Sequence, residues 1–565
     1  MKAALANRLW LFTSRKAARH FHYASRHVAE IQAGILQKYL TQNRDTEYVG
    51  RYTGRQVDKY TGKQVDKHTG RQVITNLQSP LSTHHFPLST YEDYLPYIER
   101  LANGEKNILT KDPVQLFELS SGSASASKMI PYTRTLQREF RLALSAWIHD
   151  LFTHHPDLIT GRAYWSISPL TSGPRRTPAG IPIGFEEDSA YLGSFGSIIE
   201  SSLMAVPSFV KHIQDVDDFR YVTLLYLLRC EDLRLISVWN PTFLTLLLAP
   251  LETWWDSLLK DIDEGTISPP NQSFGFAQDK SPISNLQLQI TNYKLRAQNL
   301  SKLSPTDYAS IWKHLSLISC WADGVSTPYA KELQSHFPNV TIQPKGLLAT
   351  EAFVSFPLTG YGNVLAITSH YFEFLSENGD IFLAHQLEKG KTYSVIVTTG
   401  GGLYRYQLND IVEVTGFYNQ IPCIKFIGKA DKVSDYFGEK LNEQFVAGVL
   451  KELFAKHNLN PTFYMLAPDD TPPFHYTLYI ELADNSTTRL PDHLTTELDN
   501  SLCTNFHYDY CRRLGQLAET QTVQVKDGSA AYIRACQRRG QKMGDIKPSV
   551  LQKSTGWGKQ FERGD

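Results

Sequence analysis

Hydrophobic residues along the chain follow two different spacings. Apolar side chains recur every three or four residues in 136–152 and 221–229, which predicts helices. In 393–399 and 411–415 the chain instead carries runs of β-branched residues, which predict strands. A chain that mixes long helices with short strands in this way is expected to have an α/β fold.

A second, smaller set of elements follows near the C-terminus. Residues 474–482 are rich in Tyr, Leu and Ile and predict a strand, whereas 497–517 has helical spacing. The 565 residues exceed the roughly 250–300 at which single cores stop growing. We therefore expect a large N-terminal α/β domain over 1–430 and a smaller, mobile α+β domain over 431–565.

Two segments interrupt this pattern and carry no expected function. Residues 52–73 repeat a Thr-Gly-Arg/Lys-Gln-Val unit with a period of eight, which is too short for a solenoid, whose repeats need about 20 to 50 residues. Residues 268–292 contain Pro269-Pro270 and Gln-rich polar runs. We expect surface insertions at about 51–73 and 268–292. A basic arm for an anionic partner is the alternative for the first.

Composition excludes several classes of protein. The chain has 57 basic and 57 acidic residues, so nothing global favours nucleic acid or an anionic membrane as partner. Its six cysteines form no Cys-x-x-Cys pair, which indicates reduced thiols and a cytoplasmic location. The most apolar stretch, 235–251, is interrupted by Asn240 and Pro241, and it predicts a buried helical segment instead of a membrane span.

The N-terminus allows two interpretations. The first 29 residues hold six Lys or Arg and no acidic residue, as organelle transit peptides do. An amphipathic basic helix that continues into Glu30 to Gln32 explains the same pattern. We favour the helix.

A loop rich in small residues is the first candidate for chemistry. Ser120, Ser121, Gly122 and Ser123 open a run that ends at Lys128. Backbone amides and hydroxyls in such a run can surround phosphate oxygens, and the lysine adds a positive charge. The run is not a Walker loop, because it lacks the second glycine and the Ser or Thr after the lysine. Alone, it could equally be a plain flexible loop.

Two acidic positions are candidates for the rest of a nucleotide site. Thr350 and Glu351 end an apolar, strand-like run that begins at Gly346, and a carboxylate there can hold Mg2+ beside triphosphate oxygens. Asp410 follows Tyr404 and precedes a predicted strand, where it could accept bonds from ribose hydroxyls. Either acid could instead be an ordinary strand end or turn residue.

The last two candidates lie toward the C-terminus. Residues 426–443 crowd glycines and charges, including Asp431 and Lys440, between a predicted strand and a helix, as hinges do. Lys547 follows a glycine-bearing segment near the end of the chain. A lone lysine is usually a surface charge, so Lys547 is a candidate only in combination with the motifs that precede it.

The order of these motifs resembles the acyl-CoA synthetase, adenylation-domain and luciferase superfamily of adenylate-forming enzymes. Within it, the chain is most similar to the plant auxin-responsive Gretchen Hagen family of acyl-acid amido synthetases and its bacterial relatives. The likeness rests on 91–99, 120–131, 233–239 and 401–418, and it covers nearly the whole chain apart from the insertions.

The resemblance implies an ATP site between two domains, with ATP and Mg2+ as cofactors. It implies that Ser120, Ser121, Gly122, Ser123 and Lys128 hold phosphates, with Tyr404 and Lys440 also at the nucleotide. It further implies that Thr350 meets the α-phosphate, Glu351 binds Mg2+ and Asp410 holds the ribose. Asp431 would be the hinge, and Lys547, with Lys542 as a competitor, would swing in during adenylation.

The chain departs from the family pattern in two places. Ala124 and Ala126 stand where the phosphate loop usually has Ser or Thr and then Gly, and Ala349 stands where many members have Gly or Ser. These differences put the contacts of the phosphate loop in doubt. They also leave room for a protein that binds nucleotide without catalysis.

The expected function is ATP-dependent activation of a small carboxylic acid as its acyl-adenylate, followed by transfer to an amine, with an amino acid as the family-based expectation. Alternatives are an acyl-CoA ligase, or a non-catalytic nucleotide-binding sensor or scaffold. Possible bases are His154, His155 and His370, and each is more often structural. Neither the acid nor the oligomeric state follows from the sequence. Aromatic residues that could line the acid pocket are Tyr164, Trp165 and Trp239.

Overall fold

The fold was analysed on a computed structural model, which describes most of the chain. The described residues are 2–53, 55–57, 64–66, 86–120, 128–166, 175–184, 202–213, 215–271, 293–323, 326–429, 433–434, 436–437, 439–469, 471–483, 490–491, 493–513, 516–539, 541, 546–547 and 549–561.

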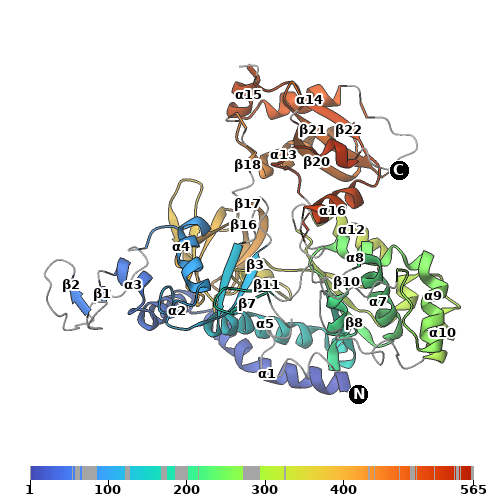
Figure 1. Cartoon of the computed structure of the whole chain (residues 1–565), viewed down its shortest axis with the longest axis horizontal. Helices are drawn as coiled ribbons and strands as arrows, with labels where there is room; N and C mark the ends of the chain where they lie inside the picture. Colours follow the sequence, from blue (N-terminus) through green and yellow to red (C-terminus); the bar gives the residue numbers. More distant parts are fainter. Residues whose placement is uncertain are drawn as a thin grey trace.

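A parallel four-stranded sheet forms one half of the N-terminal region. Its order is β10-β9-β8-β5, and every neighbouring pair is parallel. Helices cover it on the right of Figure 1, and the central strand β9 is buried along its whole length. The strands are β5 (Arg162–Trp165), β8 (Leu233–Ser237), β9 (Leu317–Cys320) and β10 (Thr341–Pro344). The helices of this half are α7 (Val216–Arg229), α8 (Pro241–Leu248), α9 (Leu251–Glu264), α10 (Lys294–Leu300), α11 (Tyr308–Ile311) and α12 (Thr327–His336).

An antiparallel seven-stranded sheet forms the centre of the molecule, in the order β11-β12-β17-β16-β15-β13-β14. Alternating burial along β16 shows that one face of this sheet packs on the core. The strands are β11 (Ser355–Leu358), β12 (Gly362–Leu365), β13 (Tyr371–Leu375), β14 (Ile381–Leu383), β15 (Thr392–Thr398), β16 (Tyr406–Tyr418) and β17 (Ile421–Lys429).

A third sheet, β4-β3-β7-β6, joins these halves. It contains β3 (Val114–Ser120), β4 (Lys128–Thr133), β6 (Arg175–Arg176) and β7 (Pro182–Ile183). The helices of this part of the chain are α1 (Lys2–Ala24), α2 (Val28–Gln42), α3 (Glu47–Tyr52), α4 (Tyr91–Ala102) and α5 (Arg134–His154). Helices α4 and α5 contact β4, and Figure 1 shows α1 running along α5.

The C-terminal region is a separate α+β unit above the others in Figure 1. A sheet of order β20-β21-β22 carries helices around it, and two hydrophobic clusters of its own fill it. Its elements are β18 (Val433–Ser434), β19 (Leu441–Asn442), α13 (Glu443–Lys456), β20 (Pro461–Asp469), β21 (His475–Leu482), α14 (Leu494–Leu502), α15 (Phe506–Arg513), β22 (Gln521–Gln524), α16 (Gly528–Arg538) and α17 (Gly558–Phe561).

The C-terminal region contacts the parallel-sheet half through α8. The side chain of Asn240, which caps α8, donates a buried hydrogen bond of 2.9 Å to the carbonyl of Ile546. Leu246 packs against the cluster around Trp557. This contact holds the last part of the chain against the parallel-sheet half.

Most predicted elements are confirmed. The predicted helices correspond to α5 and α7, and the predicted strands to β15, β16 and β21. The basic N-terminal segment is helix α1, which buries Trp10 and Phe21 in the core. No described helix is both long and apolar enough to span a membrane.

Three predicted boundaries are wrong. Residues 235–251 begin as strand β8 and continue as α8, because Pro241 starts a new helix after the Asn240 cap. The helical pattern of 497–517 is two helices, α14 and α15. The run 346–351 is a loop, and its Gly346 lies so close to the backbone of Ser355 that a side chain there would clash.

The first insertion is described in part. Its strands β1 (Arg55–Val57) and β2 (Gln64–Asp66) pair antiparallel and project away from the body on the left of Figure 1. Most of the remaining residues of 51–73, and residues 272–292 of the second insertion, lie outside the described residues.

Candidate functional site

Strands β3 and β4 bring Lys128 to the site. Ser120, the last residue of β3, pairs with Lys128, the first residue of β4. The Lys128 ammonium lies 5.4 Å from the ring centroid of Tyr91 in α4, and the Tyr91 hydroxyl accepts a hydrogen bond from the amide of Met129. The predicted phosphate residues Ser121, Gly122 and Ser123 lie outside the described residues, so their roles stay predictions.

Glu351 is a buried carboxylate whose negative charge is only weakly stabilised by neighbouring hydrogen-bond donors. It lies in the loop between β10 and β11, and the hydroxyl of Tyr406 donates to it across 3.3 Å. Burial raises the pKa of Glu351; the charges of Lys429 and Lys128 lower it, and that of Asp410 raises it further. The cluster of Glu351, Lys128, Asp410 and Lys429 therefore brings three predicted site residues together.

Asp410 is held by an ion pair across two strands. It lies in β16 directly opposite Lys429 of β17, and the Lys429 ammonium is 2.9 Å from one Asp410 oxygen. Asn409, just before it, has a left-handed φ of 59°. A buried carboxylate with one oxygen paired keeps acceptor sites for a further donor, such as a sugar hydroxyl.

Thr350 stands next to Glu351, and its carbonyl accepts a 2.5 Å hydrogen bond from the hydroxyl of Tyr132. Because Tyr132 lies in β4, this bond ties the loop that carries Thr350 to the strand that begins with Lys128. The side chain of Thr350 is partly exposed and can meet a ligand.

Two predicted nucleotide residues are not in this cluster. The ring of Tyr404 is buried in the core, where it stacks on Tyr48 and Phe86 and its hydroxyl donates to the carbonyl of Leu109. Its side chain is a packing element, and Tyr406, two residues later, reaches Glu351 instead. Lys440 is exposed with a left-handed φ of 45°, and among the described residues no hydrogen bond or ion pair joins it to the cluster.

Lys547, the lysine expected to act during adenylation, lies outside the Glu351 cluster in this conformation. The ammonium of Lys547 is 4.3 Å from the ring centroid of Trp321, at the end of β9, and the hydroxyl of Tyr532 holds the Lys547 carbonyl. Asp431 and Lys542 lie outside the described residues. The structure thus places Lys547 at the parallel sheet.

The carboxyl edge of the parallel sheet is lined by aromatic rings. Trp165, Ser237 and Ser319 are partners in register and share one face. Trp239 and Trp321 follow the two serines, with ring centroids 5.7 Å apart. In open α/β sheets, ligands bind outside the carboxyl ends of the strands.

A lysine at this edge was missed by sequence reasoning. Lys345 follows β10, and its ammonium lies 2.6 Å from the Ser237 hydroxyl, 5.2 Å from the ring centroid of Trp239 and 5.6 Å from that of Trp147. Burial lowers the pKa of Lys345 to about 8. No local signal marks it, because its neighbours come from other strands and from α5.

The histidines considered as bases do not form a catalytic pair. His370 is fully buried; its Nε2 accepts from the amide of Phe353, so Nδ1 carries the proton toward Glu139, 3.1 Å away. His154 lies beside Asp150 on the same helix, and His155 ends that helix. These positions favour structural roles for all three.

The glycines before Tyr404 serve close packing. A Cβ atom on Gly400 would stand 2.4 Å from both Glu139 and Thr135, and the Gly400 amide donates to the Glu139 carboxylate. The Gly400 carbonyl accepts from the hydroxyl of Thr133 in β4. These contacts hold the chain before β16 against α5 and β4.

A separate cavity of about 600 Å3 lies near the start of α5. It is lined by Asn43, Arg44, Lys111, Asp112 and Gly400, among others, and by none of the described residues of the Glu351 cluster.

Comparison with solved structures defines the class of protein. The fold matches GH3.15 of Arabidopsis thaliana, an acyl acid amido synthetase solved in complex with 2,4-DB, with a TM-score of 0.78 and 21% identity over 98% of this chain and 96% of that chain. It also matches a 2-hydroxyisobutyryl-CoA ligase in the postadenylation state, with a TM-score of 0.52 and 9% identity over 94% and 89% of the two chains. This is the fold of the adenylate-forming ligases.

The family follows from domain matches along nearly the whole chain. Residues 17–342 match the GH3 family N-terminal domain, 363–429 the central domain and 444–556 the C-terminal domain. The chain belongs to the GH3 family, which confirms the resemblance that its motifs indicated. A relative, the indole-3-acetic acid-amido synthetase GH3.3 of Arabidopsis thaliana, is 24% identical over 501 residues, covering 84% of this chain and 80% of the relative.

Proposed function

We propose that the protein is an ATP-dependent ligase that activates a carboxylic acid as its acyl-adenylate and then joins the acyl group to an amino acid through a carbon–nitrogen bond. The observation that carries this proposal is the cluster of Glu351, Asp410, Lys429 and Lys128 at the end of the β3–β4 pair. Membership of the GH3 family supports it.

The cluster fits a magnesium nucleotide. Glu351 is a buried carboxylate that accepts a long hydrogen bond of 3.3 Å from Tyr406, and a hard cation with oxygen ligands would compensate its charge. Mg2+ bound at Glu351 would neutralise charge on the triphosphate oxygens. Asp410 would accept bonds from the ribose, and Lys128, with the 120–123 segment, would hold phosphate oxygens.

The first half-reaction follows from these positions. The substrate carboxylate attacks the α-phosphorus of ATP in line, pyrophosphate leaves, and negative charge grows on the phosphate oxygens. Lys128 and the hydroxyl of Thr350 would stabilise that charge. Lys547 would approach the same phosphate from its position on Trp321, which lies at the edge where we place the acid.

The acid pocket is proposed at the carboxyl edge of the parallel sheet. Trp165, Trp239 and Trp321 offer broad apolar faces around Ser237 and Ser319, which suits an aromatic or other flat apolar acid. The pocket adjoins the loop that leads from Lys345 to Glu351. An acid bound there would point its carboxylate toward the nucleotide cluster.

The second half-reaction needs access for the amine. We propose that residues 431–565 move as a lid about a hinge at Asp431 and carry Lys547 away after adenylation. The hydrophobic clusters that the C-terminal region has of its own support this motion. The amine then attacks the mixed anhydride, releases AMP and loses a proton, with no covalent enzyme intermediate.

Product analysis tests this function against its alternatives. Purified protein is incubated with Mg-ATP, an aryl acid, mixed amino acids and coenzyme A together, and products are identified by mass spectrometry. Acyl-amino acids and AMP are expected. An acyl-CoA thioester as the sole product would establish an acyl-CoA ligase. ATP binding without any acyl product would favour a nucleotide sensor or scaffold.

A further inference from the structure

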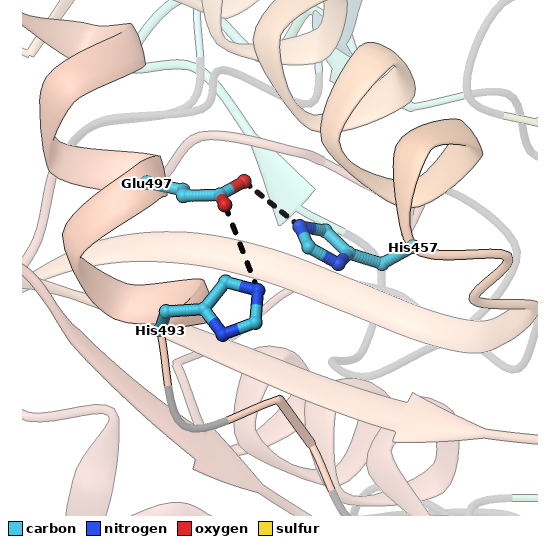
Figure 2. Close-up of side chains that lie close together, drawn as sticks. All are labelled: His457, His493 and Glu497. Atoms are coloured by element: carbon cyan, nitrogen blue, oxygen red, sulfur yellow. Dashed lines mark hydrogen bonds and ion pairs between the residues drawn. The ribbon is translucent and has the colours of Figure 1, made fainter.

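Two histidines and a glutamate meet on the C-terminal region, outside the nucleotide cluster. Figure 2 shows His457, just after α13, and His493 both pointing their rings at the carboxylate of Glu497. His493 caps α14, and Glu497 lies four residues later on the same face of that helix. The cluster therefore joins the end of one helix to the start of another.

The ligand atoms of this cluster lie close enough together to share one ion. His457 Nε2 lies 2.8 Å from Glu497 Oε2, and His493 Nε2 lies 3.6 Å from Glu497 Oε1. One ligand atom from each residue falls within 4.8 Å of the others. Bonds of about 2.0–2.2 Å to a tetrahedral ion place ligand atoms about 3.4 Å apart, so small side-chain adjustments suffice.

We propose that His457, His493 and Glu497 bind one divalent transition-metal ion, with Zn2+ as the preferred type. Two imidazoles and one carboxylate are common zinc ligands, and His493 is largely exposed, which gives the ion a path and leaves a position for water. Binding replaces the proton between His457 and Glu497. The ion ties α13 to α14 and stiffens the proposed lid.

Competing charges set the conditions for this site. The Lys456 ammonium also contacts the Glu497 carboxylate, at 2.8 Å, and therefore competes with an ion for this ligand. Lys456 must swing aside when the ion binds, and its side chain is exposed enough to do so.

Metal titration tests the proposal directly. Tag-free, chelator-treated protein is titrated with ZnCl2 in a calorimeter, beside His493→Ala and the matched control His507→Ala, another exposed histidine of the same region. One equivalent should bind to the wild type and the control, and His493→Ala should weaken binding at least about tenfold. Zn2+ should raise the midpoint of thermal unfolding of the wild type.

Two results would overturn the metal site. One is the absence of saturable Zn2+ binding by the wild type. The other is equal binding by the wild type and His493→Ala, which would assign the ion to other groups. Glu497→Gln provides a second variant that keeps the shape of the side chain, and it should weaken binding in the same way.

A second inference concerns Lys345 and rests on the proposed function. Its ammonium has three donors, but among the described residues only the Ser237 hydroxyl accepts from it. Two more polar groups in the same face have no partner within the described part of the chain: the Ser319 hydroxyl and the indole nitrogen of Trp165. Buried donors of this kind are costly unless a ligand accepts from them.

We infer that Lys345 binds a second carboxylate on the substrate acid, at the end remote from the one that is activated. The cation is held over the faces of Trp147 and Trp239, so it does not need an internal carboxylate to stay in place. Ser319 and Trp165 supply further donors to the same group. The preferred acids would then be flat apolar dicarboxylic acids.

Calorimetric binding of cinnamate and 4-carboxycinnamate tests this inference without any amine. The wild type should bind 4-carboxycinnamate at least about tenfold more tightly than cinnamate, and Lys345→Met should lose that preference. Equal binding of the two acids by the wild type, or an unchanged preference in Lys345→Met, would overturn it. Preserved preference without pyrophosphate release from any acid would refute only the proposed ligase function.

Discussion

The two ends of the proposed site are built on opposite principles. On the antiparallel sheet, Asp410 and Lys429 neutralise each other, and Tyr406 already donates to Glu351. On the parallel sheet, Lys345 and Ser319 have donors that no described residue accepts. The first end is arranged in advance for one constant ligand, whereas the second keeps its polar groups free for a variable one.

This difference suggests where specificity lies. A nucleotide is the same in every turnover, so a cluster that is already in place loses nothing by being fixed. The acid differs between members of a family of this kind, and the aromatic edge can change its preference by changing one ring or one cation. Variants at the two ends should therefore affect different kinetic parameters.

The largest effect is expected for Glu351→Gln. It keeps the size of the side chain but removes the charge that would hold Mg2+. The rate of acid-dependent ATP–pyrophosphate exchange should fall by about 100- to 1,000-fold. Glu388→Gln, an exposed control, should leave the rate unchanged. An active Glu351→Gln enzyme would contradict the role assigned to this residue.

Asp410→Asn should have the next largest effect. It breaks the ion pair with Lys429 and weakens the bonds proposed to the ribose, which at about 1.5–3 kcal/mol corresponds to a roughly 10- to 150-fold higher KM for ATP. The KM for the acid should change little. A change confined to the acid would show that the two ends are not separate.

Gly400→Ala tests the rigidity of the nucleotide end. The added Cβ would stand 2.4 Å from Glu139, and such overpacking costs about 1–3 kcal/mol, so the midpoint of thermal unfolding should fall. Gly448→Ala in α13, where the Cβ enters open space, is the matched control and should not lower it. Equal midpoints of thermal unfolding in the two variants would show that Gly400 is not required for close packing against Glu139.

Trp239→Leu tests the aromatic end. Loss of the indole face should raise the KM for aryl acids by about tenfold, because an aromatic pair contributes about 0.5–1.5 kcal/mol beyond its burial. The KM for ATP should stay the same, which steady-state kinetics with each substrate varied in turn will show. A parallel rise in both constants would indicate general loss of structure.

The smallest effect is a pH dependence at Lys345. Because the pKa of Lys345 is lowered to about 8, the ammonium is charged below that pH and loses its proton above it. Affinity for a dicarboxylic acid should therefore fall roughly threefold between pH 7.5 and 8.5, while affinity for the monocarboxylic acid stays flat. Lys345→Arg should abolish the pH dependence, because an arginine stays protonated in this range.

The spacing of apolar residues was sufficient to predict the helices and strands that are long or that bury one face regularly. Helix α5 and strands β15 and β16 have clear spacing and were predicted. The loop 346–351 was mistaken for a strand because its leucines pack in the folded chain without lying in a strand. The close contact between Gly346 and Ser355 also depends on the fold and cannot be predicted from the neighbouring residues. The turn between α14 and α15 was missed for a similar reason, since helical spacing continues through it.

For the site, the order of motifs was enough to select Lys128, Glu351 and Asp410, which the structure brings together. Lys429 and Tyr406 were missed because their roles depend on the register of β16 and β17. The ring of Tyr404 is buried in the core, and Tyr406, the first residue of β16, reaches Glu351. Trp321 and Lys345 contact Trp239 only because the parallel strands pair in the folded sheet, so sequence spacing could not predict these contacts.

The central claim is that the protein makes an acyl-adenylate and transfers it to an amino acid. The most direct measurement is pyrophosphate release with Mg-ATP and a panel of aryl, indolyl and dicarboxylic acids, with and without mixed amino acids, beside Lys128→Ala and the exposed control Lys106→Ala. We expect pyrophosphate release that depends on the acid and that amino acids accelerate. Lys128→Ala should abolish this release, and Lys106→Ala should leave it unchanged. Release that no acid stimulates, or that Lys128→Ala leaves intact, would contradict it.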